Sequence, residues 1–243
     1  MKRTPGTLVA ITFIFLSMPS HGQDYNLLVI EDSVNRPVDR SESSGTQQWW
    51  LVQPSGADAR AAPVTVTHQK PYCTKTVEAC SEGEWSQEID VRPIEDRDAE
   101  LAPPYYLLKG PIDPSLTRRV EMSGQLDSSR RESNIRVSMG VESYLISRRR
   151  TDDDSRIIIT ISGGSVVQEV YACETGGESY PYCGDEGFEE ILWSGDLDGD
   201  NRLDFIAQFT PKYSMRHYYL FTSSGAGADE HVRMAAQFTR YTD

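Results

Sequence analysis

Short runs in which apolar and polar residues alternate recur along this chain, and such alternation predicts β-strands. The clearest run is 63–68 (PVTVTH). No segment keeps an apolar period of about 3.6 residues over three turns, so at most one or two short helices are expected. In the first part of the chain the pattern predicts strands at 25–30, 48–52, 63–68, 84–91 and 105–109. From residue 118 onward it predicts strands at 118–122, 135–139, 142–147, 156–162, 165–172, 189–193, 204–209, 217–222 and 232–240.

Glycine-containing turns separate the later strands, at 163–164, 176–177, 184 and 223–227. Short strands at regular spacing with such turns are typical of antiparallel sandwiches and barrels. We therefore expect a mainly β fold, an antiparallel sandwich or barrel-like fold with few short helices. The proposed division is a signal peptide at 1–22, an N-terminal β region at 23–104 with a polar segment and the first cysteine pair, and a C-terminal β domain at 105–243.

The first residues have the organisation of a secretory signal peptide. Lys2 and Arg3 form a basic start, and 8–18 (LVAITFIFLSM) is an apolar core shorter than the roughly 20 residues that span a bilayer. Small residues at Ser20 and Gly22 fit cleavage after Gly22. The interpretation is a periplasmic or secreted protein whose mature form begins near Gln23 and has no membrane span.

Charge limits the class of partner. The formal net charge is −13, and removing Lys2 and Arg3 with the signal peptide brings it to −15. Such an acidic protein is unsuited to nucleic acid or to an anionic membrane. An arginine run at 148–150 is followed at once by aspartates at 152–154. We interpret the two runs as a solvated turn of mixed sign, with a second metal site at 152–154 as the alternative.

Four cysteines fit an oxidising compartment. Among the three possible connectivities we choose the local one, Cys73–Cys80 and Cys173–Cys183. Their spacing does not match zinc ligand pairs, and the histidines are scattered, so zinc is not expected.

An aspartate-rich loop at 196–204 (DLDGDNRLD) carries the clearest chemistry. A hard cation such as Ca²⁺ takes about six to eight oxygen ligands. Side chains at loop positions 1, 3 and 5, a backbone carbonyl at 7 and a side chain at 9 would supply them. These positions are Asp196, Asp198, Asp200, the Arg202 carbonyl and Asp204. The alternative is a solvated acidic turn that binds nothing, although four carboxylates so close together repel one another.

The loop is not an EF-hand, which requires Gly at position 6 and Glu at position 12. Here these positions hold Asn201 and Ala207. The flanking segments EILW and LDFIAQF are short and apolar, so they predict strands on both sides of the loop, a calcium-loop hairpin. Gly199 and Asn201 suit the sharp turn because these residue types tolerate a positive φ.

Strand, aspartate loop and strand together resemble a single FG-GAP/VCBS-type calcium loop, as in integrin propellers and many bacterial secreted proteins. The resemblance covers about 188–209 and includes the apolar positions Leu197, Leu203 and Ile206. Asn201 departs from it, because Gly is more usual there. The resemblance implies a structural Ca²⁺. Only one copy of the loop is present, and a propeller needs at least about four blades, so a propeller is excluded.

No catalytic motif is found: there is no G-x-S-x-G, no H-E-x-x-H and no phosphate-binding loop. His217 could be a general base, but it has no evident partner in the sequence, and a structural or surface role is favoured. Glu189 and Glu190 are adjacent, so on a strand they would point to opposite faces and could not act as a glycosidase pair. One of them could instead serve the metal site.

Two aromatic groups are candidates for a binding surface. Tyr180 and Tyr182 lie in the Cys173–Cys183 loop, which is rich in Gly, Glu, Ser and Pro and is the better surface candidate. The strand 218–221 (YYLF) and the pair Trp49 and Trp50 are interpreted as core, with a ligand surface as the alternative.

The sequence thus predicts a non-enzymatic, calcium-binding interaction protein of the bacterial envelope or exterior, with a protein or carbohydrate partner. Two alternatives are a calcium-dependent hydrolase of a surface polymer and a periplasmic enzyme inhibitor or immunity protein. The sequence does not determine the oligomeric state.

Overall fold

The computed structural model describes residues 25–30, 35–37, 45–52, 62–68, 86–93, 105–110, 112, 118–120, 122–175, 182–183, 188–212 and 215–241. The predicted signal peptide and the pair Cys73 and Cys80 lie outside these ranges. Within them every regular element is a strand, and the few short helices that we expected are not found. No helix long and apolar enough to cross a membrane is present in the described part of the chain.

The strands form three sheets, none of them closed into a barrel. The N-terminal sheet has the order β1 (Asn26–Ile30), β6 (Tyr105–Lys109), β3 (Gly45–Val52), β4 (Ala62–His68), β5 (Ser86–Pro93), β2 (Asn35–Pro37). The mid-chain sheet has the order β13 (Tyr182–Cys183), β12 (Val166–Thr175), β11 (Arg156–Gly163), β10 (Glu142–Arg150), β9 (Glu132–Met139), β8 (Met122–Gly124). The central sheet has the order β17 (Arg233–Tyr241), β16 (Met215–Thr222), β15 (Asp204–Lys212), β14 (Phe188–Asp196), β7 (Arg118–Arg119).

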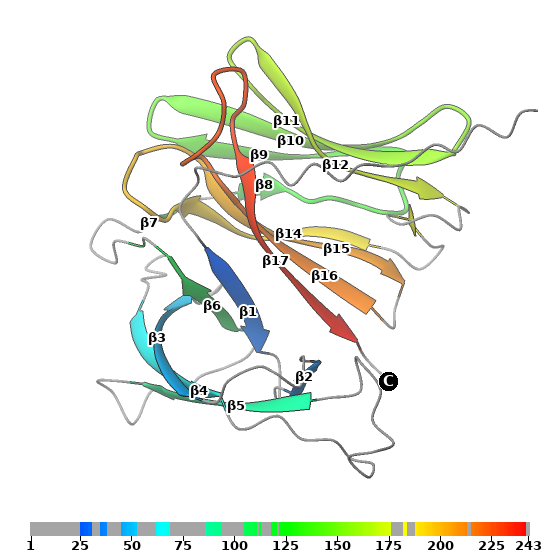
Figure 1. Cartoon of the computed structure of the whole chain (residues 1–243). Coiled ribbons are helices and arrows are strands. Elements are labelled where there is room, and N and C mark those ends of the chain that lie inside the picture. Colours follow the sequence, from blue (N-terminus) through cyan, green and yellow to red (C-terminus); the bar gives the residue numbers. More distant parts are fainter. Residues whose placement is uncertain are drawn as a thin grey trace, which may run out of the picture.

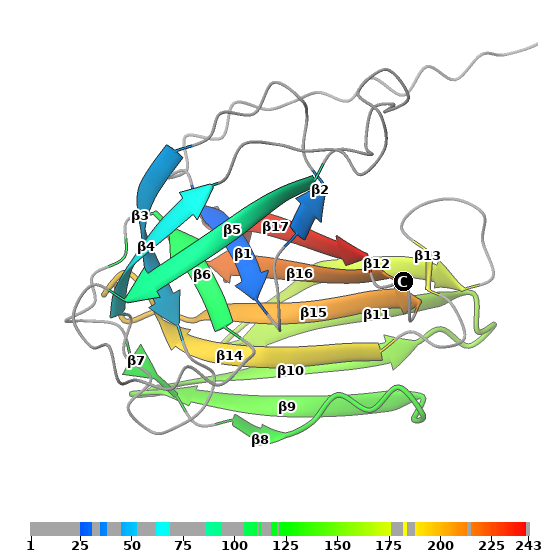
Figure 2. The same ribbon diagram turned by 90° about the horizontal axis from the view of Figure 1, so that it is seen from below.

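The central sheet is covered on both faces. It lies between the mid-chain sheet and the N-terminal sheet (Figure 1), and Figure 2 shows strands β1 and β6 crossing the central strands obliquely. One hydrophobic core fills the space between the mid-chain and central sheets. A second core joins the central sheet to β1, β3 and β6. The fold is therefore a layered β structure of sandwich type, and it is not a propeller.

The burial patterns follow from this layering. In β9 the side chains alternate between exposed and buried, because one face of the mid-chain sheet meets solvent. In β16 all six residues from His217 to Thr222 are buried. Tyr218 and Leu220 enter one core while Tyr219 and Phe221 enter the other. A strand covered on both faces needs apolar residues at successive positions, which explains the run YYLF.

Most predicted strands are present, with shifted ends. The run 118–122 is divided: β7 pairs with β14 of the central sheet, and β8 pairs with β9 of the mid-chain sheet. Strands β2 and β13 lack an apolar pattern and were not predicted. The run 105–109, which begins our C-terminal region, forms β6 and pairs with β1 and β3 of the N-terminal sheet.

The arginine run at 148–150 is not a solvated turn, and this prediction was wrong. Arg148 is fully buried near the end of β10, where its Nε lies 2.7 Å from Glu189 Oε2 of β14. Its Nη1 donates to the Arg130 carbonyl at 2.8 Å. A buried arginine needs a carboxylate and a further acceptor, and both come from residues distant in sequence. The turn itself begins at Thr151, and there Asp152 and its neighbours are exposed, as expected.

The predicted disulfide Cys173–Cys183 is confirmed. It joins β12 to β13, its Cα atoms are 5.5 Å apart, and both residues are buried in the core between the mid-chain and central sheets.

Candidate metal site

The aspartate loop connects two central strands of the molecule. β14 ends at Asp196, β15 begins at Asp204, and the antiparallel register places Gly195 opposite Asp204. Residues 197–203 make the reversal, with Gly199 at φ 85° and Asn201 at φ 61°. These left-handed conformations are most accessible to Gly and Asn, so the loop has the residue types that its backbone requires. The predicted hairpin is confirmed.

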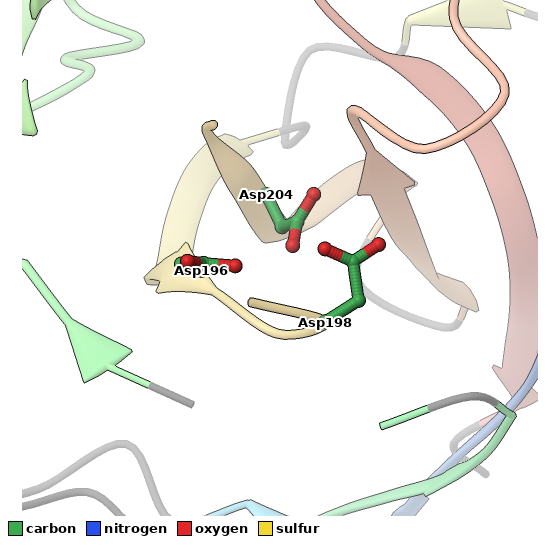
Figure 3. Close-up of side chains that lie close together, drawn as sticks. All are labelled: Asp196, Asp198 and Asp204. Carbon is green, nitrogen blue, oxygen red and sulfur yellow. The ribbon is translucent and has the colours of Figure 1, made fainter. Parts of the chain in front are cut away.

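Three aspartate side chains converge in this loop. One carboxylate oxygen from each of Asp196, Asp198 and Asp204 lies within 4.8 Å of the others (Figure 3). Asp204 is fully buried, Asp196 is 3 % exposed and Asp198 is half-buried. The cluster thus offers only oxygen ligands, which suits a hard cation.

Backbone N–H groups orient the Asp196 carboxylate. Gly199 N–H donates to Oδ1 at 2.7 Å and Asn201 N–H to Oδ2 at 2.9 Å. Burial raises the pKa of Asp196, the nearby charges of Asp198 and Asp200 add to the rise, and the two N–H donors oppose it. The loop therefore holds the Asp196 carboxylate in place with two neutral N–H donors, which supply no compensating positive charge.

Asp204 is held in the same way from two directions. Leu197 N–H donates to Oδ2 at 2.8 Å and Ser223 N–H donates to Oδ1 at 2.7 Å. Burial raises the pKa of Asp204 to about 8, against the effect of these donors. Among the described residues no Lys, Arg or His forms an ion pair with this carboxylate or with Asp196. Among the side chains that the structure describes, the cluster therefore has no cationic partner.

Asp200, predicted as a ligand, is exposed and does not join the three converging carboxylates. Its Oδ1 accepts the Arg202 N–H at 2.7 Å, and its Oδ2 accepts the Ser223 hydroxyl at 2.8 Å. The same hydroxyl lies 3.1 Å from Asp204 Oδ1. The Ser223 hydroxyl therefore links the Asp200 carboxylate to the cluster through Asp204. No observation tests the Arg202 carbonyl, which remains a predicted ligand.

Ser223 was not found by reading the sequence. It lies in the turn after β16, 19 residues beyond Asp204, and no local pattern connects the two. The Arg202 guanidinium reaches the same turn, 3.4 Å from the Ser223 and Glu230 carbonyls and 3.5 Å from that of His231. The aspartate loop and the β16–β17 turn therefore form one structural unit.

Other candidate groups do not gather into sites. Asp152, Asp153 and Asp154 are exposed, and their carboxylates do not converge as those of the loop do. Glu189 is buried against Arg148, whereas Glu190 is exposed, so the two face opposite sides as predicted. Glu189 precedes Asp196 by seven strand residues, roughly 23 Å, and is too distant to serve the metal cluster.

The aromatic candidates are mostly core. Trp49 is buried, Trp50 packs against the second core, and the strand 218–221 is enclosed between sheets. His217 is buried, with Nδ1 2.8 Å from Thr239 Oγ1, which agrees with a structural role. Tyr180 lies outside the described residues, and Tyr182 is described only through the backbone of β13.

A pocket of about 400 Å³ lies beside the loop. Its lining residues come from the loop, from the β9–β10 turn and from the segment after β7: Asp196, Asn201, Met139, Gly140, Val141, Glu142 and Val120. Val141, at the tip of the turn, is fully exposed. This end of the molecule thus offers a recess in contact with a metal-cluster residue.

Comparison with protein families finds no family that matches this chain. Neither curated proteins nor solved structures provide a significant match.

Proposed function

We propose that this chain is a periplasmic or secreted protein that binds one Ca²⁺ in the aspartate loop and uses the ion-stabilised end of the sandwich to bind a partner. The observation that carries the proposal is the convergence of Asp196, Asp198 and Asp204 within 4.8 Å, with no ion pair to them among the described side chains. A buried carboxylate must be paired, protonated or bound to a metal, and a bound cation would keep all three carboxylates ionised at neutral pH. The likeness of the loop to FG-GAP/VCBS-type repeats supports the same proposal.

Calcium is the ion that we favour. Ca²⁺ accepts six to eight oxygens at about 2.3–2.6 Å in flexible geometry, whereas Mg²⁺ requires a near-ideal octahedron at about 2.0–2.1 Å and keeps several waters. A loop with three converging carboxylates and Asp200 next to them offers many oxygens and no fixed octahedron. The ion would neutralise the carboxylates and hold the β14–β15 connection in shape.

The proposal of a binding partner is supported by the location of a pocket and an exposed apolar residue beside the loop. The pocket beside the loop and the exposed Val141 lie at the end of the molecule that the ion would stabilise. We infer a protein or carbohydrate partner of the cell envelope or exterior, bound by a surface whose shape depends on calcium.

The direct test is thermal unfolding of the mature chain in calcium, in magnesium and in chelator. A ligand at a hundredfold excess over Kd stabilises the folded state by about 2.7 kcal/mol, which for a chain of this size corresponds to roughly 5 to 10 °C. Calcium should produce this shift and magnesium a smaller one. Asp198→Ala and Asp200→Ala should remove the calcium response. Equal melting in calcium and chelator for the parent chain would refute the metal site.

A further inference from the structure

Two buried hydroxyl groups next to the aspartate loop make no hydrogen bond of ordinary geometry. Tyr25, which directly precedes β1, is 7 % exposed, and its hydroxyl lies against Ser224 and Asp198 without a well-formed hydrogen bond to either. The hydroxyl of Ser224, in the turn after β16, is also buried and unpaired. Buried polar groups almost always have a partner, so an unpaired one needs an explanation, and a water or an ion beside it is one of these.

Both hydroxyls lie at the metal cluster. The Tyr25 phenol is next to the Asp198 carboxylate and to Ser224. Burial is the main cause that raises the pKa of Tyr25 to about 12; the nearby Ser224 hydroxyl opposes the rise, and the negative charges of Asp198 and Asp204 add to it. Ser224 follows Ser223, whose N–H and hydroxyl contact Asp204.

The position of Tyr25 is set by packing. A Cβ at Gly110 would collide with the Tyr25 ring, so the ring lies directly on this glycine at the end of β6. Tyr25 also belongs to the core that joins the N-terminal sheet to the central sheet, together with Leu197 of the aspartate loop. The Tyr25 hydroxyl, next to the first strand of the N-terminal sheet, thus lies at the aspartate loop of the central sheet.

We propose that the metal site extends beyond the loop, and that Tyr25 and Ser224 bind the water molecules that complete the ion's shell. Three carboxylates and one carbonyl leave positions of a Ca²⁺ shell for water. Groups that hydrogen-bond to such waters orient the shell and strengthen binding. This inference rests on the proposed function, since it requires that the loop binds an ion.

The extended site has a structural consequence. β1 lies beside β17 and contacts β16 (Figure 1). The core that contains Leu27 of β1 also contains Leu197 of the loop. With the ion bound, the Tyr25 hydroxyl gains its partner, so calcium joins the N-terminal sheet to the central sheet. Without the ion, this hydroxyl keeps only its imperfect contacts with Ser224 and Asp198, and the contact between the sheets is weaker.

The test is calorimetric titration of calcium into the mature chain and into Tyr25→Phe and Ser224→Ala. Because such outer groups contribute about 10- to 100-fold to metal affinity, Tyr25→Phe should weaken calcium binding by at least tenfold, with Ser224→Ala weakening it in the same direction. Tyr106→Phe is the matched control, a buried tyrosine of β6 in the same core, and should leave calcium binding unchanged. In chelator, Tyr25→Phe should melt no lower than the parent, which separates metal binding from folding.

Hydrogen exchange gives the second readout. Calcium should slow amide exchange in residues 26–30 of the parent chain and leave these amides unchanged in Tyr25→Phe. Unchanged calcium affinity in both Tyr25→Phe and Ser224→Ala would overturn the extended site, while the loop would still be a calcium site. Absence of calcium binding by the parent chain would overturn both proposals.

Discussion

The paired strands β14 and β15 carry buried carboxylates at both ends, and the two ends neutralise them differently. At one end Glu189, 5 % exposed, pairs with the fully buried Arg148 at 2.7 Å. At the other end Asp196 and Asp204 are as deeply buried, but their described partners are N–H groups and the Ser223 hydroxyl. The first end is neutralised within the chain, whereas the second has no described cationic partner, and under our proposal a cation from solution neutralises it.

The difference has a physical meaning for stability. A cation that belongs to the chain is always present, so the Glu189 end should not respond to ions in the solvent. A cation from solution makes stability depend on its concentration and on pH, because protons compete with the metal for the carboxylates. Under the proposal, one sheet combines a permanent ion pair, Arg148–Glu189, with an aspartate cluster whose charge is neutralised only when a cation is bound.

The largest effect should follow from breaking the permanent pair. Arg148→Met leaves Glu189 buried without a cation, which costs about 3–5 kcal/mol of unfolding free energy. Urea unfolding should show this loss equally in calcium and in chelator. The double variant Arg148→Met with Glu189→Leu should recover most of it, because it removes the unpaired charge. A single variant as stable as the parent would contradict this account of the pair.

The unfolding free energy contributed by the Asp196 and Asp204 end should depend on pH when calcium is removed. The folded-state pKa of Asp204, about 8, lies above its ordinary value of 3.8, so the folded chain binds this proton more tightly than the unfolded chain. The stabilisation is therefore fully present below about pH 4 and is lost as pH rises through 8. In chelator, the unfolding free energy should increase by roughly 3 kcal/mol between pH 8 and pH 5.

Calcium should remove or reverse this trend, since metal binding favours the ionised carboxylate. The measurement is urea unfolding across this pH range with calcium and with chelator. Stability in chelator that falls on acidification from pH 8 would show that Asp204 is not protonated in the metal-free fold.

Asp198→Asn sharpens the comparison by removing one charge of the cluster with little change in shape. It should abolish the calcium stabilisation, about 2.7 kcal/mol at a hundredfold excess over Kd, and leave the chain in chelator nearly unaffected. Asp152→Asn, an exposed aspartate of the β10–β11 turn, is the control and should keep the full calcium response. A loss of stability in chelator as large as in calcium would show that Asp198 acts through packing and not through the ion.

The smallest effect concerns the backbone of the loop. Asn201 has φ 61° and its side chain is exposed. Asn201→Ala should cost about 1 kcal/mol in calcium and in chelator alike, because alanine tolerates the left-handed region poorly. Asn201→Gly should be neutral or slightly stabilising. If the alanine variant were destabilised only in calcium, the residue would act on the ion and not on the turn.

Local patterns predicted much of this molecule. Alternation gave most strands, and the aspartate spacing gave the loop and three residues that converge. Strands β2 and β13 were missed, because they are short, lack an apolar pattern and are held by pairing with β5 and β12. The run 118–122 was predicted as one strand, because no local signal shows that β7 and β8 join different sheets.

Arg148 shows the limit of such patterns. Its neighbours are arginines and aspartates, which indicate a turn, but its environment is set by Glu189, 41 residues away. The bulge in β14 is a second case. It places Ile191 in one core and Trp193 in the other, although residues two apart in a regular strand share a face.

The sequence by itself predicted most of the strand content, favoured the Cys173–Cys183 pair and indicated the oxygen-rich cluster of the 196–204 loop, because these depend on residues close together in the chain. The tertiary structure alone decided that the central sheet is covered twice, that Arg148 is buried and that Ser223 and Tyr25 lie at the aspartates. These contacts join segments from different sheets, and their energy comes from burial and pairing that exist only after the layers have packed together.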